Sequence, residues 1–132
     1  MTIQDANGPL NILIVEDEML IALDIERMLV ELGHNIVALH TRIPAALAAA
    51  GRDQIDFAVL DINVAGNPSF PVARVLRARN VPFLFLSGYG ARGLIDGFTD
   101  APVLTKPFSQ SDLGLMVKSV LATNAQTPDD TA

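Results

Sequence analysis

The regular alternation of short apolar runs with helical patterns is the feature that most constrains the fold. Five runs are apolar almost throughout, at residues 10–15, 35–39, 57–60, 81–86 and 103–105. Runs of this kind are typical of strands that are covered on both faces, as in parallel sheets. Helical patterns separate them, except at residues 88–97, whose four glycines predict only a weak fourth helix.

Strands that alternate with helices predict right-handed crossovers and a doubly wound α/β fold. For five parallel strands we expect the flavodoxin-like order 2-1-3-4-5, whose ligand site lies at the carboxyl ends of the strands, where strands 1 and 3 meet. We expect a single domain at residues 10–122. Residues 1–9 and 123–132 are polar and lack periodicity, which predicts disordered tails.

Composition removes several classes of function. The chain has 132 residues and no cysteine, which excludes disulfides and thiolate sites. Its formal charge of -6 argues against nucleic acid as a direct partner. No signal peptide is recognisable, and no apolar run approaches the ~20 residues of a membrane span. We therefore expect a cytoplasmic protein without membrane insertion.

Polar side chains follow four of the predicted strands. Glu16 and Asp17 follow the first strand, Asp61 the third, Ser87 the fourth and Lys106 the fifth. Each has an ordinary interpretation: Glu16 as an acid favoured by a helix N-terminus, Asp17 as a helix N-cap, Asp61 and Ser87 as turn residues, and Lys106 as a solvated lysine. The predicted order makes these strands neighbours, so we expect the polar ends to converge on one edge of the sheet.

Such a group of side chains suits phosphoryl chemistry. Carboxylates within a few ångströms repel each other, and a hard divalent cation with oxygen ligands relieves that repulsion. Lys106 and Ser87 would neutralise and hydrogen-bond phosphoryl oxygens, which leaves Asp61 as the candidate nucleophile.

Four motifs carry a family resemblance. In order along residues 10–122 they are "LIVEDE" (13–18), "VLDIN" (59–63), "FLSGYG" (85–90) and "TKPF" (105–108). Together they resemble the receiver domain of bacterial two-component response regulators, the CheY-like family. The third motif is similar to that of the FATGUY subclass, commonly stand-alone receivers that pair with HWE-type sensor kinases.

The resemblance implies a single-domain response regulator that accepts a phosphoryl group on Asp61 from a kinase phosphohistidine. Asp17, Asp61 and the backbone carbonyl of Asn63 would bind Mg²⁺ or Mn²⁺, with Glu16 acting mostly through water. Ser87 and Lys106 would contact the acyl phosphate, and a cis peptide would precede Pro107. A histidine phosphotransfer protein and a downstream target are further expected partners, and no turnover enzyme is implied.

One position departs from the family pattern. Val103 stands where many receivers carry an aromatic residue that swings inward on activation, so we expect signalling through a different change near residues 87–106. Tyr89, between Gly88 and Gly90, is the candidate substitute. On the first helix, we expect Leu20 and Leu23 to lie outside the inward face, as a docking site for the kinase.

Other classes of protein remain as alternatives. A flavodoxin needs a phosphate loop rich in Ser or Thr after the first strand, and three acids there disfavour it. An aspartyl phosphatase typically has a second acid at the position of Asn63. A purely structural interaction domain would show no dependence on Mg²⁺. Among receivers, an adaptor, a phosphate sink and a relay intermediate all stay open.

Overall fold

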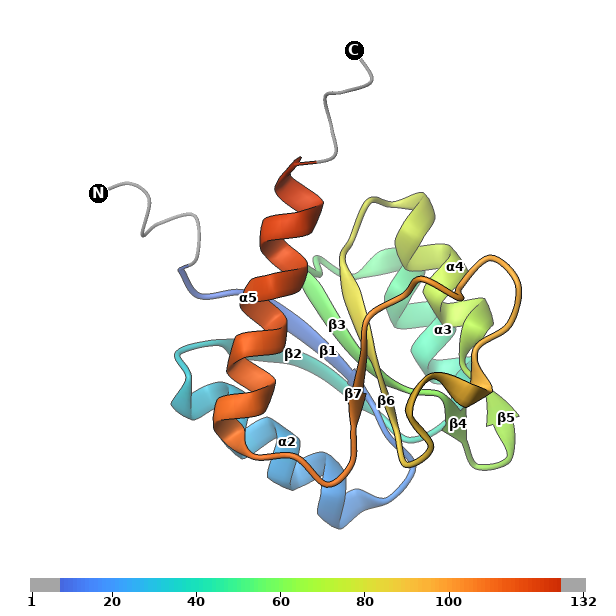
Figure 1. The fold of residues 1–132 in the computed structure, drawn as a ribbon, viewed down its shortest axis with the longest axis horizontal. Helices are drawn as coiled ribbons and strands as arrows, with labels where there is room; N and C mark the ends of the chain where they lie inside the picture. Colours follow the sequence, from blue (N-terminus) through green and yellow to red (C-terminus); the bar gives the residue numbers. More distant parts are fainter. Residues whose placement is uncertain (1–7, 127–132) are drawn as a thin grey trace.

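The strands form the predicted five-stranded parallel sheet. The computed structural model describes residues 8–126. The strand order is β2-β1-β3-β6-β7, which confirms the flavodoxin-like order (Figure 1). The strands are β1 (Asn11–Val15), β2 (Asn35–His40), β3 (Phe57–Asp61), β6 (Phe83–Ser87) and β7 (Val103–Thr105).

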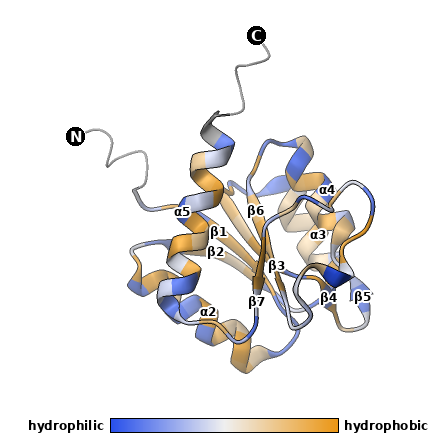
Figure 2. Ribbon diagram, in the orientation of Figure 1, coloured by the Kyte–Doolittle hydropathy of each residue, from blue (hydrophilic) through white to orange (hydrophobic). Residues whose placement is uncertain are grey.

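Helices cover both faces of the sheet (Figure 1). α2 (Met19–Glu31) and α5 (Gln110–Gln126) pack on one face, and α3 (Ile43–Arg52) and α4 (Phe70–Ala78) pack on the other. The apolar strands therefore lie between two helical layers (Figure 2). In β1, Ile12 and Ile14 belong to the core under α2 and α5, whereas Leu13 and Val15 belong to the opposite core. This double burial explains why the runs are apolar throughout.

Two helix ends follow the signals in the sequence. α2 ends just before Gly33, whose φ is 100°. The N–H of Gly33 donates to the Val30 carbonyl at 2.9 Å, and that of His34 donates to the Leu29 carbonyl at 3.0 Å. This is a Schellman motif, in which the left-handed position favours glycine. Before α5, Ser109 and Asp112 form a reciprocal cap: each side chain accepts the other's backbone N–H, at 3.0 and 2.9 Å.

Two helices continue further along the chain than local signals in the sequence indicate. Gly51 does not end α3, which continues through Arg52. Residues 123–126 are not part of a disordered tail, because α5 continues through Gln126. No glycine or proline interrupts the chain between Leu121 and Gln126, so helix propagation continues. The rest of the C-terminal tail and residues 1–7 lie outside the described residues.

The weak fourth helix is a single 3-10 turn, η1 (Gly90–Gly93). A long irregular segment links it to β7, and the Lys106–Pro107 peptide after β7 is cis, as the family resemblance implies. Among residues 8–126, no helix combines the length and apolar character that crossing a membrane requires.

A small hairpin after β3 was not predicted. Strands β4 (Asn63–Val64) and β5 (Asn67–Pro68) pair antiparallel around a two-residue turn. Both turn residues have positive φ, 53° at Ala65 and 83° at Gly66, as in the type I′ turns that match the twist of a hairpin. The hairpin stands at the carboxyl edge of the sheet, between β3 and α4 (Figure 1).

Candidate functional site

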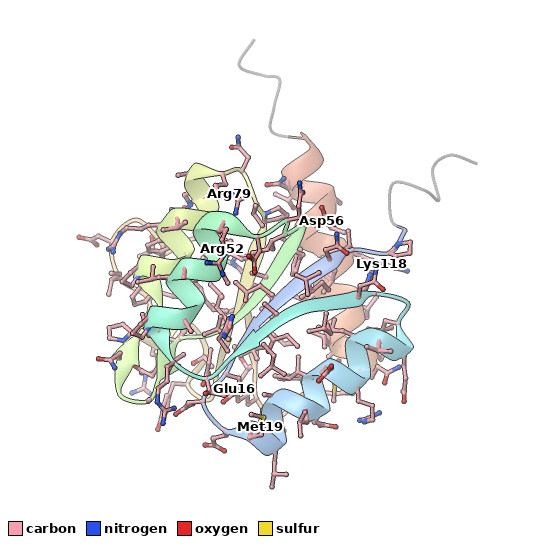
Figure 3. The ribbon with its side chains drawn as sticks, turned by 180° about the vertical axis from the view of Figure 1, so that it is seen from behind. Glu16, Met19, Arg52, Asp56, Arg79 and Lys118 are labelled. Atoms are coloured by element: carbon pink, nitrogen blue, oxygen red, sulfur yellow. The ribbon has the colours of Figure 1, made fainter. Side chains whose placement is uncertain are left out.

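The polar strand ends converge as the topology predicts. Asp61 is the last residue of β3 and Ser87 the last of β6, while Glu16 and Lys106 directly follow β1 and β7. The parallel pairings are in register up to this edge: Val15 lies beside Leu60, Asp61 beside Leu86, and Ser87 beside Thr105. Figure 3 shows Glu16 at this end of the molecule, near the start of α2, and Asp56 toward the opposite end.

Lys106 bridges two of the acids. Its Nζ lies 3.1 Å from Oε1 of Glu16 and 3.2 Å from Oδ1 of Asp61. The exposed fraction of the side chain is 25% for Lys106, 14% for Asp61 and only 1% for Glu16. The backbone N–H of Glu18 donates to the second oxygen of Glu16 at 3.2 Å. Lys106 is therefore an internal counter-ion rather than a solvated surface lysine.

Burial and mutual repulsion change the acidity of the group. Burial, followed by the charge of Asp61, raises the pKa of Glu16 to about 7. Burial also raises the pKa of Asp61, although the Lys106 ammonium opposes the shift. For Lys106, burial lowers the pKa, but the carboxylates of Asp61 and Glu16 outweigh it and the net shift is upward. When the acids are ionised, the site holds more negative charge than one lysine neutralises.

The acids could hold a hard cation. Glu16, Asp17 and Asp61 each offer a carboxylate oxygen, and these oxygens lie within 4.8 Å of one another. All the offered donors are oxygens, and the excess negative charge matches a divalent ion such as Mg²⁺, so the residues fit. Asp17 is not the N-cap of α2: Glu18 holds that position, with no side-chain cap hydrogen bond.

Asn63 follows Asp61 by two residues and is the first residue of the unpredicted hairpin. The Ser69 N–H donates to the Ile62 carbonyl at 2.8 Å, which closes the base of the hairpin. Hydrogen-bonded and non-hydrogen-bonded pairs alternate in an antiparallel ladder, so the next pair, Asn63 with Pro68, is a non-hydrogen-bonded one. The Asn63 carbonyl is therefore not used by the ladder and could serve as a ligand.

Ser87 has turn chemistry as well as a place in the site. It is 6% exposed, and its Oγ accepts the backbone N–H of Tyr89 at 2.9 Å. Tyr89 is 75% exposed, so in this structure it does not fill the place of an inward aromatic residue. Val103 pairs with Phe85 and packs partly buried against the core. Gly90 has a φ of 62°, which requires the left-handed backbone that glycine adopts readily.

An aromatic cluster anchors the irregular segment. Phe98 is only 2% exposed, and its ring centroid lies 5.2 Å from that of Phe70 and 5.9 Å from that of Phe85. The guanidinium of Arg77 lies 4.4 Å from the Phe98 ring centroid and donates to the Gly97 carbonyl at 2.7 Å. The segment is thus fixed at Phe98, although its glycines predict only a weak helix.

The start of α2 presents an apolar surface. Leu20 is 84% exposed and Leu23 48%, as expected, and Met19 is 50% exposed beside them. Neither the sheet nor α5 covers these side chains. The surface lies next to the carboxylates, because α2 begins three residues after Glu16.

Comparisons with known proteins point to one family. The chain is 38% identical to SdrG from Sphingomonas melonis Fr1, with a TM-score of 0.76 over 86% of this chain and 97% of that one. It is 30% identical to the receiver (REC) domain of the response regulator PhyR from Erythrobacter litoralis, with a TM-score of 0.76 over 89% of this chain and 93% of that one.

A sequence relative agrees with these structures. The chain is 32% identical over 113 residues to the transcriptional regulatory protein PdtaR of Mycobacterium tuberculosis, which spans 83% of this chain and 55% of PdtaR. The chain spans about half the length of the curated relatives it matches. No protein-family model matches it.

Proposed function

Because the chain belongs to the receiver-domain family of response regulators, we propose that Asp61 accepts a phosphoryl group from the phosphohistidine of a sensor histidine kinase. The observation that carries the proposal is the position of Asp61 at the end of β3, 3.2 Å from the Lys106 ammonium and within the group of acids. The arrangement supports the proposal, because it brings together a carboxylate that could act as the nucleophile, an internal cation and oxygens that could bind a divalent ion.

The transfer would form one bond and break one. An Asp61 carboxylate oxygen attacks phosphorus, the O–P bond forms, and the P–N bond to the kinase imidazole breaks, so that the imidazole leaves with the electron pair. Asp61 must be ionised to attack. Lys106 favours that ionised form, because its charge opposes the upward shift that burial gives the pKa of Asp61.

The other residues would stabilise the phosphoryl oxygens. The Ser87 Oγ accepts an N–H from Tyr89, but its own hydroxyl proton remains available for donation to a phosphoryl oxygen. Lys106 would neutralise a second oxygen. Asp17, Asp61 and the Asn63 carbonyl would hold Mg²⁺ or Mn²⁺, with Glu16 acting through water, and the ion would supply charge neutralisation during transfer.

Partners follow from the same proposal. A helix of the kinase would dock on the exposed side chains of Met19, Leu20 and Leu23. We propose a kinase of the HWE type, because "FLSGYG" resembles the FATGUY motif. Phosphorylation would alter residues 87–106, since Ser87 and Lys106 belong to both the site and this segment. A downstream protein, or a histidine phosphotransfer protein, would recognise the altered surface.

Labelling with Mg²⁺ and a small acyl phosphate tests the assignment. The chain should gain a single, stoichiometric phosphoryl group by intact mass, and Asp61→Asn should lose it because an amide is a much poorer nucleophile. Asp56→Asn is a matched control, because Asp56 immediately precedes β3 whereas Asp61 ends it. Labelling of Asp61→Asn at full stoichiometry would refute the proposal.

The same experiment separates the alternatives. Continuous turnover of phosphate esters would favour an aspartyl phosphatase, which Asn63 disfavours because an amide cannot act as a general acid. Failure of labelling, with and without Mg²⁺, would leave a structural interaction domain. We propose that the chain assists its own phosphorylation and dephosphorylation but is not a turnover enzyme.

A further inference from the structure

A hydrogen bond joins the tip of the β4–β5 hairpin to Asp17. The backbone N–H of Ala65 donates to Oδ2 of Asp17 at 2.9 Å, across 48 positions of sequence. The acid follows β1 and the hairpin follows β3, so the contact links the two strands that carry the candidate metal ligands. Asp17 is therefore oriented by the hairpin and not by the helix that follows it.

The base of the hairpin is fixed to the end of β3. Ser69 is fully buried, and its Oγ donates to the backbone carbonyl of Asp61 at 2.6 Å. Its N–H also holds the Ile62 carbonyl at 2.8 Å. A displacement of the Asp61 backbone would thus be transmitted through the hairpin to Ala65 and to Asp17.

This arrangement occupies one oxygen of Asp17 and one of Asp61. Oδ2 of Asp17 accepts from Ala65, and Oδ1 of Asp61 is paired with Lys106. Glu16 has both oxygens engaged, by Lys106 and by the N–H of Glu18. Asp17 and Asp61 are therefore set to offer one oxygen each, and neither is set to chelate with both.

The number of oxygens on offer discriminates between cations. Mg²⁺ is small, prefers octahedral geometry, and keeps several waters while using one or two carboxylates. Ca²⁺ takes 6–8 oxygens and readily uses carboxylates with both oxygens. A site whose acids are each restricted to one oxygen favours the smaller ion.

We propose that the Ala65 N–H is a positioning group that restricts Asp17 to one-oxygen ligation, so that the hairpin makes the site selective for Mg²⁺ over Ca²⁺. The inference rests on the proposed metal site and adds to it a source of selectivity. It assigns the hairpin, and Ser69 at its base, to the function of the site rather than to the connection between β3 and α4.

Binding of each cation to the full chain, measured by calorimetry without any phosphoryl donor, tests the inference. Ala65→Pro removes the N–H, and Ala65→Gly keeps it while relieving the positive φ of 53°. Loss of a group that hydrogen-bonds a metal ligand typically lowers metal affinity by about 10–100-fold. For Ala65→Pro we expect the low end, a loss of about 10-fold in Mg²⁺ affinity, because the hairpin tip is open to water that can replace the lost donor. Ca²⁺ affinity should fall less or rise, whereas Ala65→Gly should bind both ions as the unchanged chain does.

Because proline cannot adopt the observed φ, a second variant replaces only the Ala65 amide N–H by an ester oxygen, and circular dichroism checks the fold of both. A smaller ratio of Mg²⁺ to Ca²⁺ affinity in the ester variant supports the inference. An unchanged ratio in the folded variants overturns it while the metal site stands. If the unchanged chain binds neither ion, the proposed metal site itself is wrong, and the inference with it.

Discussion

Replacing Lys106 with methionine removes a charge but little volume, so it isolates the electrostatics of the site. In the native chain the ammonium lies 3.1 Å from Glu16 and 3.2 Å from Asp61. In Lys106→Met the two carboxylates face each other without a cation. They can respond by taking up protons, so the effect on stability must depend on pH.

The size of the effect follows from burial. Removing one partner of a buried ion pair typically costs about 3–5 kcal/mol, because a buried charge is left uncompensated. Here the Lys106 side chain is 25% exposed, so water partly solvates the charges, and Glu16, with a pKa of about 7, can take up a proton at small cost. We therefore expect a loss of about 1–3 kcal/mol in the free energy of unfolding at pH 8.

The direction of the pH dependence is fixed by the sign of the shifts. An acid whose pKa is raised by folding stabilises the folded state when protonated, and that contribution is lost as pH rises through the folded pKa. For Glu16 in the native chain the window runs from the ordinary 4.5 to about 7. In Lys106→Met both acids have still higher pKa values, so the loss continues at higher pH and the two stability curves separate as pH rises.

Urea unfolding in the presence of a chelator, at several values between pH 5 and 8, measures this difference. Lys118→Met is the matched control, because Lys118 lies exposed on α5, away from the acids (Figure 3). Its stability should follow that of the native chain at every pH. A gap between Lys106→Met and the native chain that stays constant over the range, or widens toward low pH, would refute the reasoning.

Three further predictions concern other parts of the molecule. Leu20→Ser with Leu23→Ser should slow phosphoryl transfer from the kinase with a change in stability of less than about 0.5 kcal/mol; unchanged transfer rules out docking there. Amide exchange across residues 88–98 should slow when Mg²⁺ and beryllofluoride bind, and equal protection with and without beryllofluoride excludes the segment as the switch. Phe98→Ala should speed the exchange and lower the free energy of unfolding by up to about 3–5 kcal/mol. Burial lowers the pKa of His34, whose Nδ1 accepts the Leu10 N–H. The contribution of neutral His34 to the free energy of unfolding, present above pH 6.5, should therefore be lost as pH falls through the lowered pKa. Urea midpoints of His34→Gln that track those of the native chain between pH 7 and 5 would contradict this.

The sequence predicts the sheet and the convergence of the site for a common reason. Burial on both faces leaves an apolar run at each strand, and five such runs with helices between them admit few topologies. Once strands 1, 3, 4 and 5 are neighbours, Glu16, Asp61, Ser87 and Lys106 must meet. Their distances could not be predicted, since they depend on the orientation of side chains in the folded chain.

The anchoring of the segment before β7 shows where composition misleads. Four glycines predicted a weak helix, and the helix there is indeed reduced to η1. Phe98 nevertheless lies among the aromatic rings of the core under Arg77. A lone aromatic residue in a polar stretch carries no periodicity, so only the tertiary structure reveals its burial.

The hairpin after β3 escaped prediction because each of its signals is weak alone. Its strands have two residues each, too short for a period-2 pattern, and its turn is Ala-Gly where Asn-Gly is the strong signal. Asp17 was ambiguous for the same reason: local rules favour an acid before a helix as its N-cap. The contact with Ala65 decides the matter, because an oxygen committed to the hairpin orients the carboxylate toward Asp61 instead of the helix. What local sequence describes as a turn and a cap is therefore one tertiary unit, and the candidate metal site draws on both halves of it.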